Sequence, residues 1–226
     1  MIKTPKPSFD EEQILWDTGY DFVIGIDEVG RGSFAGPVVV AAVVFEKNFD
    51  KRLKSDSSLA QLFAKIRDSK MLSPKQREFL TPFIKKNAHV FSIQKTNVRL
   101  INKVGIGKAT QKAMRKAIYR VREKLHSTSV FVLVDGFHIK YVKKLGLKNQ
   151  KAIVKGDQTS VSIASASIIA KVYRDDLMKR LHKTFPQYGF DKHKGYGTKM
   201  HQEAIKRIGL SPLHRTSFNL LRFLKV

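Results

Sequence analysis

Cysteine is absent from the 226-residue chain. This absence excludes disulfide bonds and metal sites built from thiolates, and it fits a protein that works in a reducing compartment.

Long apolar runs are also missing. The longest, residues 38–45, is far shorter than the roughly 20 residues of a membrane-spanning helix. The first seven residues have no apolar segment of the kind found in secretory signal peptides. We therefore expect no membrane association and a location in the cytoplasm.

Acidic residues are scarce. There are 19 Asp and Glu against 43 Lys and Arg, a formal net charge of +24. Excess charge of one sign indicates partners rather than fold. Nucleic acid is the commonest partner of a basic protein, although an anionic membrane or an acidic protein would also attract it.

Alternating strand and helix patterns predict one α/β domain with a mixed sheet. Residues 1–20 look like a polar lead-in, because Pro5 and Pro7 discourage regular structure. Almost every residue of the second strand is apolar, so we expect both of its faces to be covered. The predicted strands span 22–29, 37–45, 88–94, 130–135 and 152–155, and the predicted helices span 59–66, 107–125, 160–181, 198–208 and 218–224.

Four of the few acids lie at the ends of predicted strands. Asp27 and Glu28 close the first strand, Asp135 closes the fourth, and Asp157 follows the fifth. Ligands of α/β proteins bind beyond the carboxyl ends of parallel strands, so these acids are expected to converge. Oxygen ligands of this kind suit Mg²⁺, and two such ions can activate water and stabilise a leaving oxygen in phosphodiester hydrolysis.

Structural roles remain open for individual acids. Side chains alternate along a strand, so Asp27 and Glu28 cannot both point to one face. Asp157 precedes a predicted helix and could be its N-cap. Asp175 and Asp176 lie in the middle of that helix beside Arg174, where salt bridges are the expected role.

The residues around these acids carry a resemblance. From about Phe22 to Phe218 the chain resembles the type 2 ribonucleases H, the ribonuclease HII family. Six blocks match in the same order, namely residues 25–32 with 35–37, 68–73, 134–136, 155–157, 162–175, and 185–190 with 193–198.

The resemblance implies a ribonuclease H-like α/β fold, with a five-stranded mixed sheet flanked by helices and a C-terminal helical portion. The expected divisions are the lead-in 1–20, a catalytic core 21–184 and a C-terminal portion 185–226. In this family four acids bind two Mg²⁺ or Mn²⁺ ions. They correspond here to Asp27, Glu28, Asp135 and Asp157.

The resemblance also implies a substrate site. The turn Gly30, Arg31 and Gly32 corresponds to the family's sensor of the ribose 2′-hydroxyl, the group that distinguishes RNA from DNA. Tyr196 matches a tyrosine that packs on the sugar at the RNA–DNA junction, and Lys70 matches a lysine that contacts phosphate.

Two further features of the matching blocks have no assigned chemistry. His193 and His214 do not have the spacing of a zinc site and are candidates for neighbours of phosphate or of the active site. The run of Ser and Ala in residues 160–170 is expected to pack the helix closely on the sheet.

The function implied is metal-dependent endonucleolytic cleavage of RNA in RNA–DNA hybrids, and of ribonucleotides embedded in duplex DNA, leaving 5′-phosphate and 3′-hydroxyl ends. We expect a monomer. Two alternatives remain: a basic nucleic-acid-binding protein without catalysis, and a ribonuclease H-fold nuclease that cuts all-DNA substrates.

Overall fold

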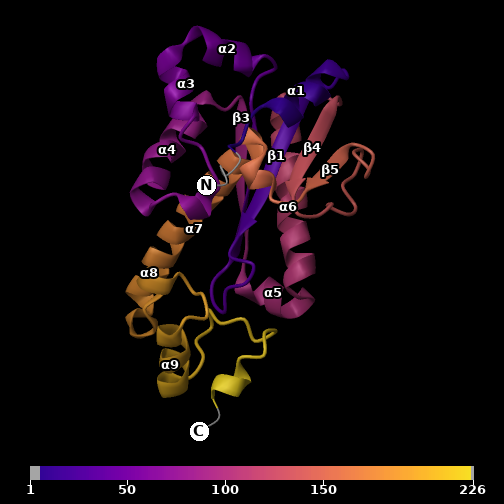
Figure 1. The fold of residues 1–226 in the computed structure, drawn as a ribbon. Coiled ribbons are helices and arrows are strands. Elements are labelled where there is room, and N and C mark those ends of the chain that lie inside the picture. Colours follow the sequence, from indigo (N-terminus) through magenta and orange to yellow (C-terminus); the bar gives the residue numbers. More distant parts are fainter. Residues whose placement is uncertain (1–5, 225–226) are drawn as a thin grey trace.

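The computed structural model describes residues 6–224, which form a five-stranded mixed sheet in the order β3-β2-β1-β4-β5 (Figure 1). Antiparallel pairing joins β1 to β2 and β2 to β3, whereas β4 pairs in parallel with β1 and β5. The strands are β1 Phe22–Val29, β2 Val38–Val44, β3 Val90–Thr96, β4 Val130–Asp135 and β5 Gln150–Ile153. The predicted five-stranded mixed sheet is confirmed, with its last strand two residues earlier than expected.

Helices cover the sheet and extend beyond it. The α-helices are α1 Asp10–Asp17, α2 Phe49–Ser55, α3 Ser57–Phe63, α4 Pro74–Asn87, α5 Val98–Val104, α6 Ile106–Leu125, α7 Val161–Thr184, α8 Phe190–His193 and α9 Lys199–Ile208, and the short 3-10 helices are η1 Ser69–Met71, η2 Gly156–Gln158, η3 Pro186–Tyr188 and η4 Leu221–Phe223.

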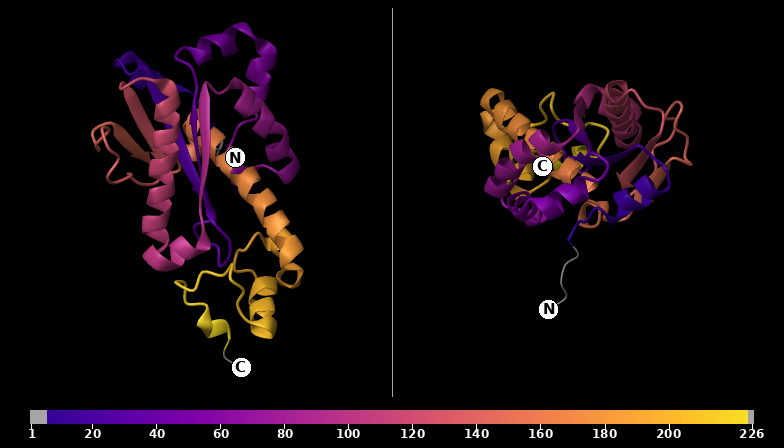
Figure 2. Two further views of the ribbon diagram at one scale, coloured as in Figure 1. Left: turned by 180° about the vertical axis from the view of Figure 1, so that it is seen from behind. Right: turned by 90° about the horizontal axis from the view of Figure 1, so that it is seen from above.

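Helix α7 packs on one face of the sheet and α6 on the other (Figure 2). Every residue of β2 is buried, which confirms that both faces of this strand are covered. The apolar stripe of α6 includes Ala113, Ala117 and Val121, all buried against the sheet. Each face of the central strands therefore has its own apolar core.

The small residues of α7 allow a close approach to β1. A Cβ atom added at Gly25 would lie 2.3 Å from the backbone carbon of Ser162. Residues 160–170 are all buried, which confirms the expected close packing. A bulkier residue at Gly25 would push the helix off the strand that carries the candidate acids.

The prediction of an irregular lead-in was wrong over α1. Phe9 and Trp16 pack in the core against the α7 side of the sheet. Buried Glu12 accepts hydrogen bonds from the Ser160 and Ser162 hydroxyl groups at 2.6 Å each. Tertiary contacts with the start of α7 thus stabilise a helix that the prolines only precede. The prediction for residues 1–5 lies outside the described residues.

The prediction of a helix over 218–224 was also wrong, because only the 3-10 turn η4 forms there. Helices α4 and α5 were not expected. Helix α4 begins with a capping box, in which the Ser73 hydroxyl accepts from the Gln76 amide and the Gln76 side chain accepts from the Ser73 amide. Pro82 inside α4 hides its helical pattern.

The segment after α7 lies beyond the carboxyl end of β1 (Figure 1). Its small apolar cluster joins Phe190 and Ala204 to Ala35, which follows β1, and to Met178 of α7. None of the helices in the described part of the chain is long and apolar enough to cross a membrane.

Candidate metal centre and substrate site

Three of the predicted acids converge at one edge of the sheet. One carboxylate oxygen each from Asp27, Asp135 and Asp157 lies within 4.8 Å of the others. Asp27 and Asp135 occupy the ends of the neighbouring strands β1 and β4, and Asp157 lies in η2 just after β5. The parallel pairing of these strands places their carboxyl ends side by side.

Glu28 points to the other face of β1, as the alternation of side chains requires. Val29 and Val23 join the core under α7, whereas Ile26 joins the core under α6. The Glu28 carboxylate lies 3.6 Å from the Arg31 guanidinium and lines the same cleft as Asp27 and Asp135. It borders the three-acid group rather than belonging to it.

Burial and mutual repulsion raise the pKa values of these acids. Burial raises the pKa of Asp27 well above its usual value, and the nearby charges of Glu28 and Asp135 raise it further. Burial is also the main cause that raises the pKa of Glu28 to about 7, and burial with the charge of Asp68 raises that of Asp157 to about 6. A divalent cation would relieve this repulsion.

The donor set fits a hard divalent cation. It consists of carboxylate oxygens only, from three chain segments, and those oxygens are close enough to share an ion. The Gly156 amide donates to Asp135 Oδ1 at 2.7 Å, and the Glu28 amide donates to Asp27 Oδ1 at 2.6 Å. These bonds hold two of the carboxylates in place while leaving a second oxygen on each available.

The N-cap alternative for Asp157 is wrong. The N-cap of α7 is Ser160, whose side chain accepts from the Ile163 amide. Asp175 and Asp176 have the expected salt bridges, to Lys171 at 2.8 Å and Lys179 at 3.3 Å.

A fifth acid, Asp68, lies beside Asp157 and was missed as a site residue. Burial opposes its ionisation, but hydrogen bonds from the Lys70 amide and the Gln158 side chain outweigh burial and lower its pKa. A proton shared by the pair therefore resides on Asp157. The signal was its place in the matching block 68–73.

Ser167 and Lys171 of α7 were also missed. The Ser167 hydroxyl lies close enough to Asp27 to oppose the rise in its pKa, and it lies 2.9 Å from the Ser69 hydroxyl. Ser167 and Lys171 both line the cleft, and both belong to the matching block 162–175. The small-residue pattern of this block had suggested packing alone.

The turn after β1 carries two glycines with different surroundings. At Gly30, where φ is +92°, an added Cβ would lie 2.0 Å from Arg174 Nε. At Gly32 an added Cβ would meet no described atom within 4 Å. Packing inside the protein thus demands glycine at the first position, whereas the second position faces open space.

Two fully buried arginines hold this turn from behind. Arg215 donates to the carbonyl oxygens of Gly30 at 2.7 Å and Arg31 at 2.8 Å. Arg174 donates to the Ser33 hydroxyl at 2.9 Å and to the Lys194 carbonyl at 3.0 Å. Within residues 6–224 neither guanidinium forms an ion pair, and burial is the main cause that lowers the pKa of both.

Tyr196 and Lys70 line the same cleft as Asp27 and Asp135. The Tyr196 ring packs against Arg174, whose Cζ is 5.3 Å from the ring centroid. Lys70 Nζ lies 3.8 Å from Asp157, and its side chain is 80% exposed. One cleft, with a volume of about 450 Å³, is lined by Asp27, Glu28, Val29, Gly30, Arg31, Ser69, Lys70, Asp135, Ser167, Lys171 and Tyr196.

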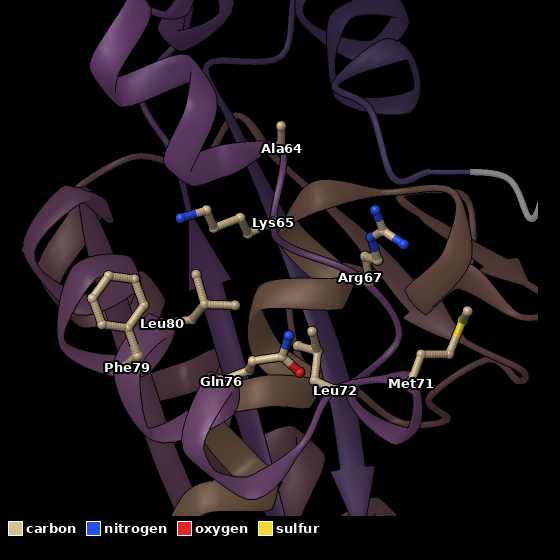
Figure 3. A pocket seen from close by; sticks show the side chains of 8 residues that line it. All are labelled: Ala64, Lys65, Arg67, Met71, Leu72, Gln76, Phe79 and Leu80. Carbon is tan, nitrogen blue, oxygen red and sulfur yellow. The ribbon is translucent and has the colours of Figure 1, made fainter.

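A second hollow, of about 260 Å³, lies between α4 and the loop that leads to η1 (Figure 3). Its lining includes Phe79 and Leu80 of α4 together with Lys65 and Arg67, but no carboxylate. It therefore offers no carboxylate ligand for a divalent cation, and the candidate chemistry belongs to the cleft at the strand ends.

The two candidate histidines lie behind the cleft and not in it. His193 and His214 are buried and contact His201, a third histidine that the sequence had not singled out. Neither faces the group of acids as a ligand. Neither histidine is among the residues that line the cleft, and a role as a neighbour of phosphate stays a prediction.

Comparison of the sequence with known proteins identifies a family and several relatives. The sequence profile of the family described as Ribonuclease HII matches residues 24–221. Ribonuclease HII of Acholeplasma laidlawii is 43% identical over 207 residues, which cover 92% of each chain. Ribonuclease HII of Chlamydia trachomatis serovar D is 42% identical over 220 residues, which cover 97% of this chain and 91% of the relative.

Solved structures show the same fold at lower identity. Ribonuclease H2 from Pyrococcus horikoshii OT3 superposes with a TM-score of 0.69 at 23% identity, covering 91% of this chain and all of that one. Bst-RNase HIII, solved in complex with Mn²⁺, gives a TM-score of 0.70 at 20% identity, covering 92% of this chain and 70% of the other. The ribonuclease H-like fold is thereby confirmed.

Proposed function

The chain belongs to the ribonuclease HII family, and from that premise we propose that it cuts RNA–DNA hybrids and single ribonucleotides embedded in duplex DNA, leaving 5′-phosphate and 3′-hydroxyl ends. It is a metal-dependent endoribonuclease of hybrids, as its family is. The observation that carries the finer proposal is that Gly30 and Arg31 of the turn line one cleft together with Tyr196 and with acids of the metal-binding group.

Asp27, Asp135 and Asp157 would hold divalent cations, Mg²⁺ or Mn²⁺, with Glu28 completing the set from the edge of the cleft. The chemistry that such ions supply when bound is activation of water and stabilisation of the departing 3′-oxygen. Two ions are supported by the number of acids, since Asp68 adds a further carboxylate beside Asp157.

The turn would recognise the ribose. Its carbonyl oxygens at Gly30 and Arg31 accept from Arg215, so the turn's shape is fixed before substrate arrives. The open side of Gly32 lets a sugar approach the backbone closely. A 2′-hydroxyl both donates and accepts, and a deoxyribose cannot replace it.

Tyr196 and Lys70 would orient the strand. The Tyr196 ring, held over Arg174, offers a flat face to the sugar beside the scissile bond. Charges of Asp157 and Asp68 raise the pKa of Lys70 despite partial burial, so its ammonium stays charged for a backbone phosphate.

One assay separates this proposal from both alternatives. A DNA duplex with one embedded ribonucleotide is compared with its all-DNA twin, each with Mg²⁺ and with EDTA. We expect a single cut beside the ribonucleotide in Mg²⁺ alone. Equal cutting of the twins would instead indicate a DNA nuclease, and salt-sensitive binding without any cutting would indicate a binding protein.

A further inference from the structure

Two buried histidines form a chain of hydrogen bonds that ends on the backbone of Tyr196. Ser211 donates from its amide to His214 Nδ1 at 2.9 Å. His214 Nε2 lies 3.0 Å from His201 Nε2. His201 Nδ1 in turn lies 3.0 Å from the Tyr196 carbonyl oxygen. The chain links the loop after α9 to the tyrosine of the cleft.

The two ends of the chain favour one tautomer of each ring. The Ser211 amide, which can only donate, lies 2.9 Å from His214 Nδ1, nearer than the Ser211 carbonyl oxygen at 3.3 Å, and this favours the tautomer with its proton on Nε2. The Tyr196 carbonyl can only accept, so His201 carries its proton on Nδ1. His214 Nε2 therefore donates to the free Nε2 of His201. Each group in the chain donates a hydrogen bond to the next, from Ser211 to Tyr196.

The surroundings favour neutral rings. His201 is fully buried and His214 nearly so. Burial lowers the pKa of each to about 4, with repulsion from neighbouring histidines adding to it. The His193 ring stacks on His201 with centroids 4.3 Å apart. A proton added to either ring would place two N–H groups against each other and break the chain.

The chain acts on a short turn. The Tyr196 carbonyl also accepts from the Thr198 amide at 2.9 Å, and the Tyr196 amide donates to the His193 carbonyl at 3.0 Å. Gly197 between them lies against the Phe34 ring, and its carbonyl accepts from the Gln202 side chain at 2.7 Å. The histidine chain thus ties the peptide of Tyr196 to α9 and to the loop that follows it.

We propose that His201 and His214 are positioning residues that hold Tyr196 at the angle its ring needs to meet the sugar. This inference rests on the proposed function, in which Tyr196 contacts the substrate. Neither histidine touches the reacting atoms. Their effect passes through the Tyr196 carbonyl, and it depends on an N–H donor at each step.

Comparing substitutions of similar size separates the loss of a hydrogen-bond donor from the loss of side-chain volume. In His214→Gln the side-chain amide can donate to His201 as Nε2 does, whereas His214→Leu fills similar space without a donor. His201→Asn and His201→Leu make the same comparison one step closer to Tyr196, and they serve if a variant at 214 does not fold. His126→Gln, at an exposed histidine, is the control.

The first readout needs no substrate. Hydrogen exchange at the Thr198 amide reports opening of the turn. We expect exchange about tenfold faster in each Leu variant than in its amide partner, the loss anticipated for one buried hydrogen bond. Equal exchange in the Leu and amide variants would overturn the inference, whatever the protein cuts.

The second readout is a double-mutant cycle on the ribonucleotide-containing duplex. With Tyr196 present, His214→Leu should lower kcat/KM about tenfold, mainly through KM, and His214→Gln should restore most of it. In a Tyr196→Ala background the same substitution should change kcat/KM less than about twofold. Equal losses in both backgrounds would show a role independent of Tyr196.

Failure of the unsubstituted protein to cut would refute the proposed function, and the exchange result would still decide whether the histidines position Tyr196.

Discussion

At the scale of residues, the two glycines of the turn predict opposite effects of one methyl group. Gly30→Ala would clash with Arg174, so we expect unfolding to become easier by about 2 kcal/mol or more. Gly32→Ala should leave the melting temperature within about 1 °C but lower kcat/KM on a ribonucleotide substrate about tenfold or more. Thermal melts and kinetics on the pair check this, and a fully active Gly32→Ala would contradict the proposed sensor.

The raised pKa values of the acids predict how stability varies with pH. Without metal, Glu28 (pKa about 7) and Asp157 (pKa about 6) bind more protons in the folded than in the unfolded chain. Stability therefore falls as pH rises through this range. His201 and His214, with pKa values lowered to about 4, and His193, whose pKa burial also lowers, act oppositely, and their effect fades as pH rises past the ordinary histidine value of about 6.5.

The window in which the acids dominate thus lies from about pH 7 to 8. In EDTA the melting temperature should fall over this window, and saturating Mg²⁺ should flatten the fall because the cation replaces the protons. A melt series at fixed ionic strength measures it. A flat profile in EDTA would show that the acids do not repel each other as the structure indicates.

Some residues of the site could be predicted from the sequence and others could not. Asp27 and Asp135 were predictable because each lies at the end of an apolar strand, and Asp157 because it follows the short strand β5. Arg174 and Arg215 were not identified as supports of the turn, because arginine is rarely fully buried and its acceptors here are backbone carbonyls from distant segments.

At the scale of elements, the sheet and the two long helices followed from their periodicity. Helix α1 did not, because its stability comes from contacts with α7 and the core that are remote in sequence. The same reasoning explains why the predicted helix over 218–224 does not form. Its apolar residues have a helical spacing, but that spacing alone does not stabilise a full helix. Local pattern predicts an element well only when its own apolar face decides its packing.

The contact between α1 and α7 supports a prediction of its own. Glu12→Leu would leave the Ser160 and Ser162 hydroxyl groups without their buried acceptor, so we expect a loss of about 2–4 kcal/mol in the free energy of unfolding. Glu12→Gln retains an acceptor oxygen and should lose less. Urea melts of the two variants measure the difference, which equal stability of both would refute. Activity at 25 °C should survive in each.

At the scale of the whole molecule, the net charge of +24 predicts strongly salt-dependent substrate binding. Counterions released from the duplex weaken binding as salt rises, so KM for a hybrid should increase about tenfold or more between 50 and 200 mM KCl. The rate at saturating substrate should change little. A KM that does not respond to salt would mean that the basic surface lies away from the substrate.

The central claim is that the acids at the strand ends hold the metal used for cleavage and are not needed for the fold. The most direct measurement compares Asp135→Asn with Asp176→Asn, an exposed salt-bridge control, in single-turnover cleavage of an RNA–DNA hybrid with Mg²⁺. Asp135→Asn should lower the rate at least about a thousandfold and keep or raise the melting temperature, since one repelling charge is removed. The control should cleave normally. Retained cleavage by Asp135→Asn, or loss of its fold, would contradict the account.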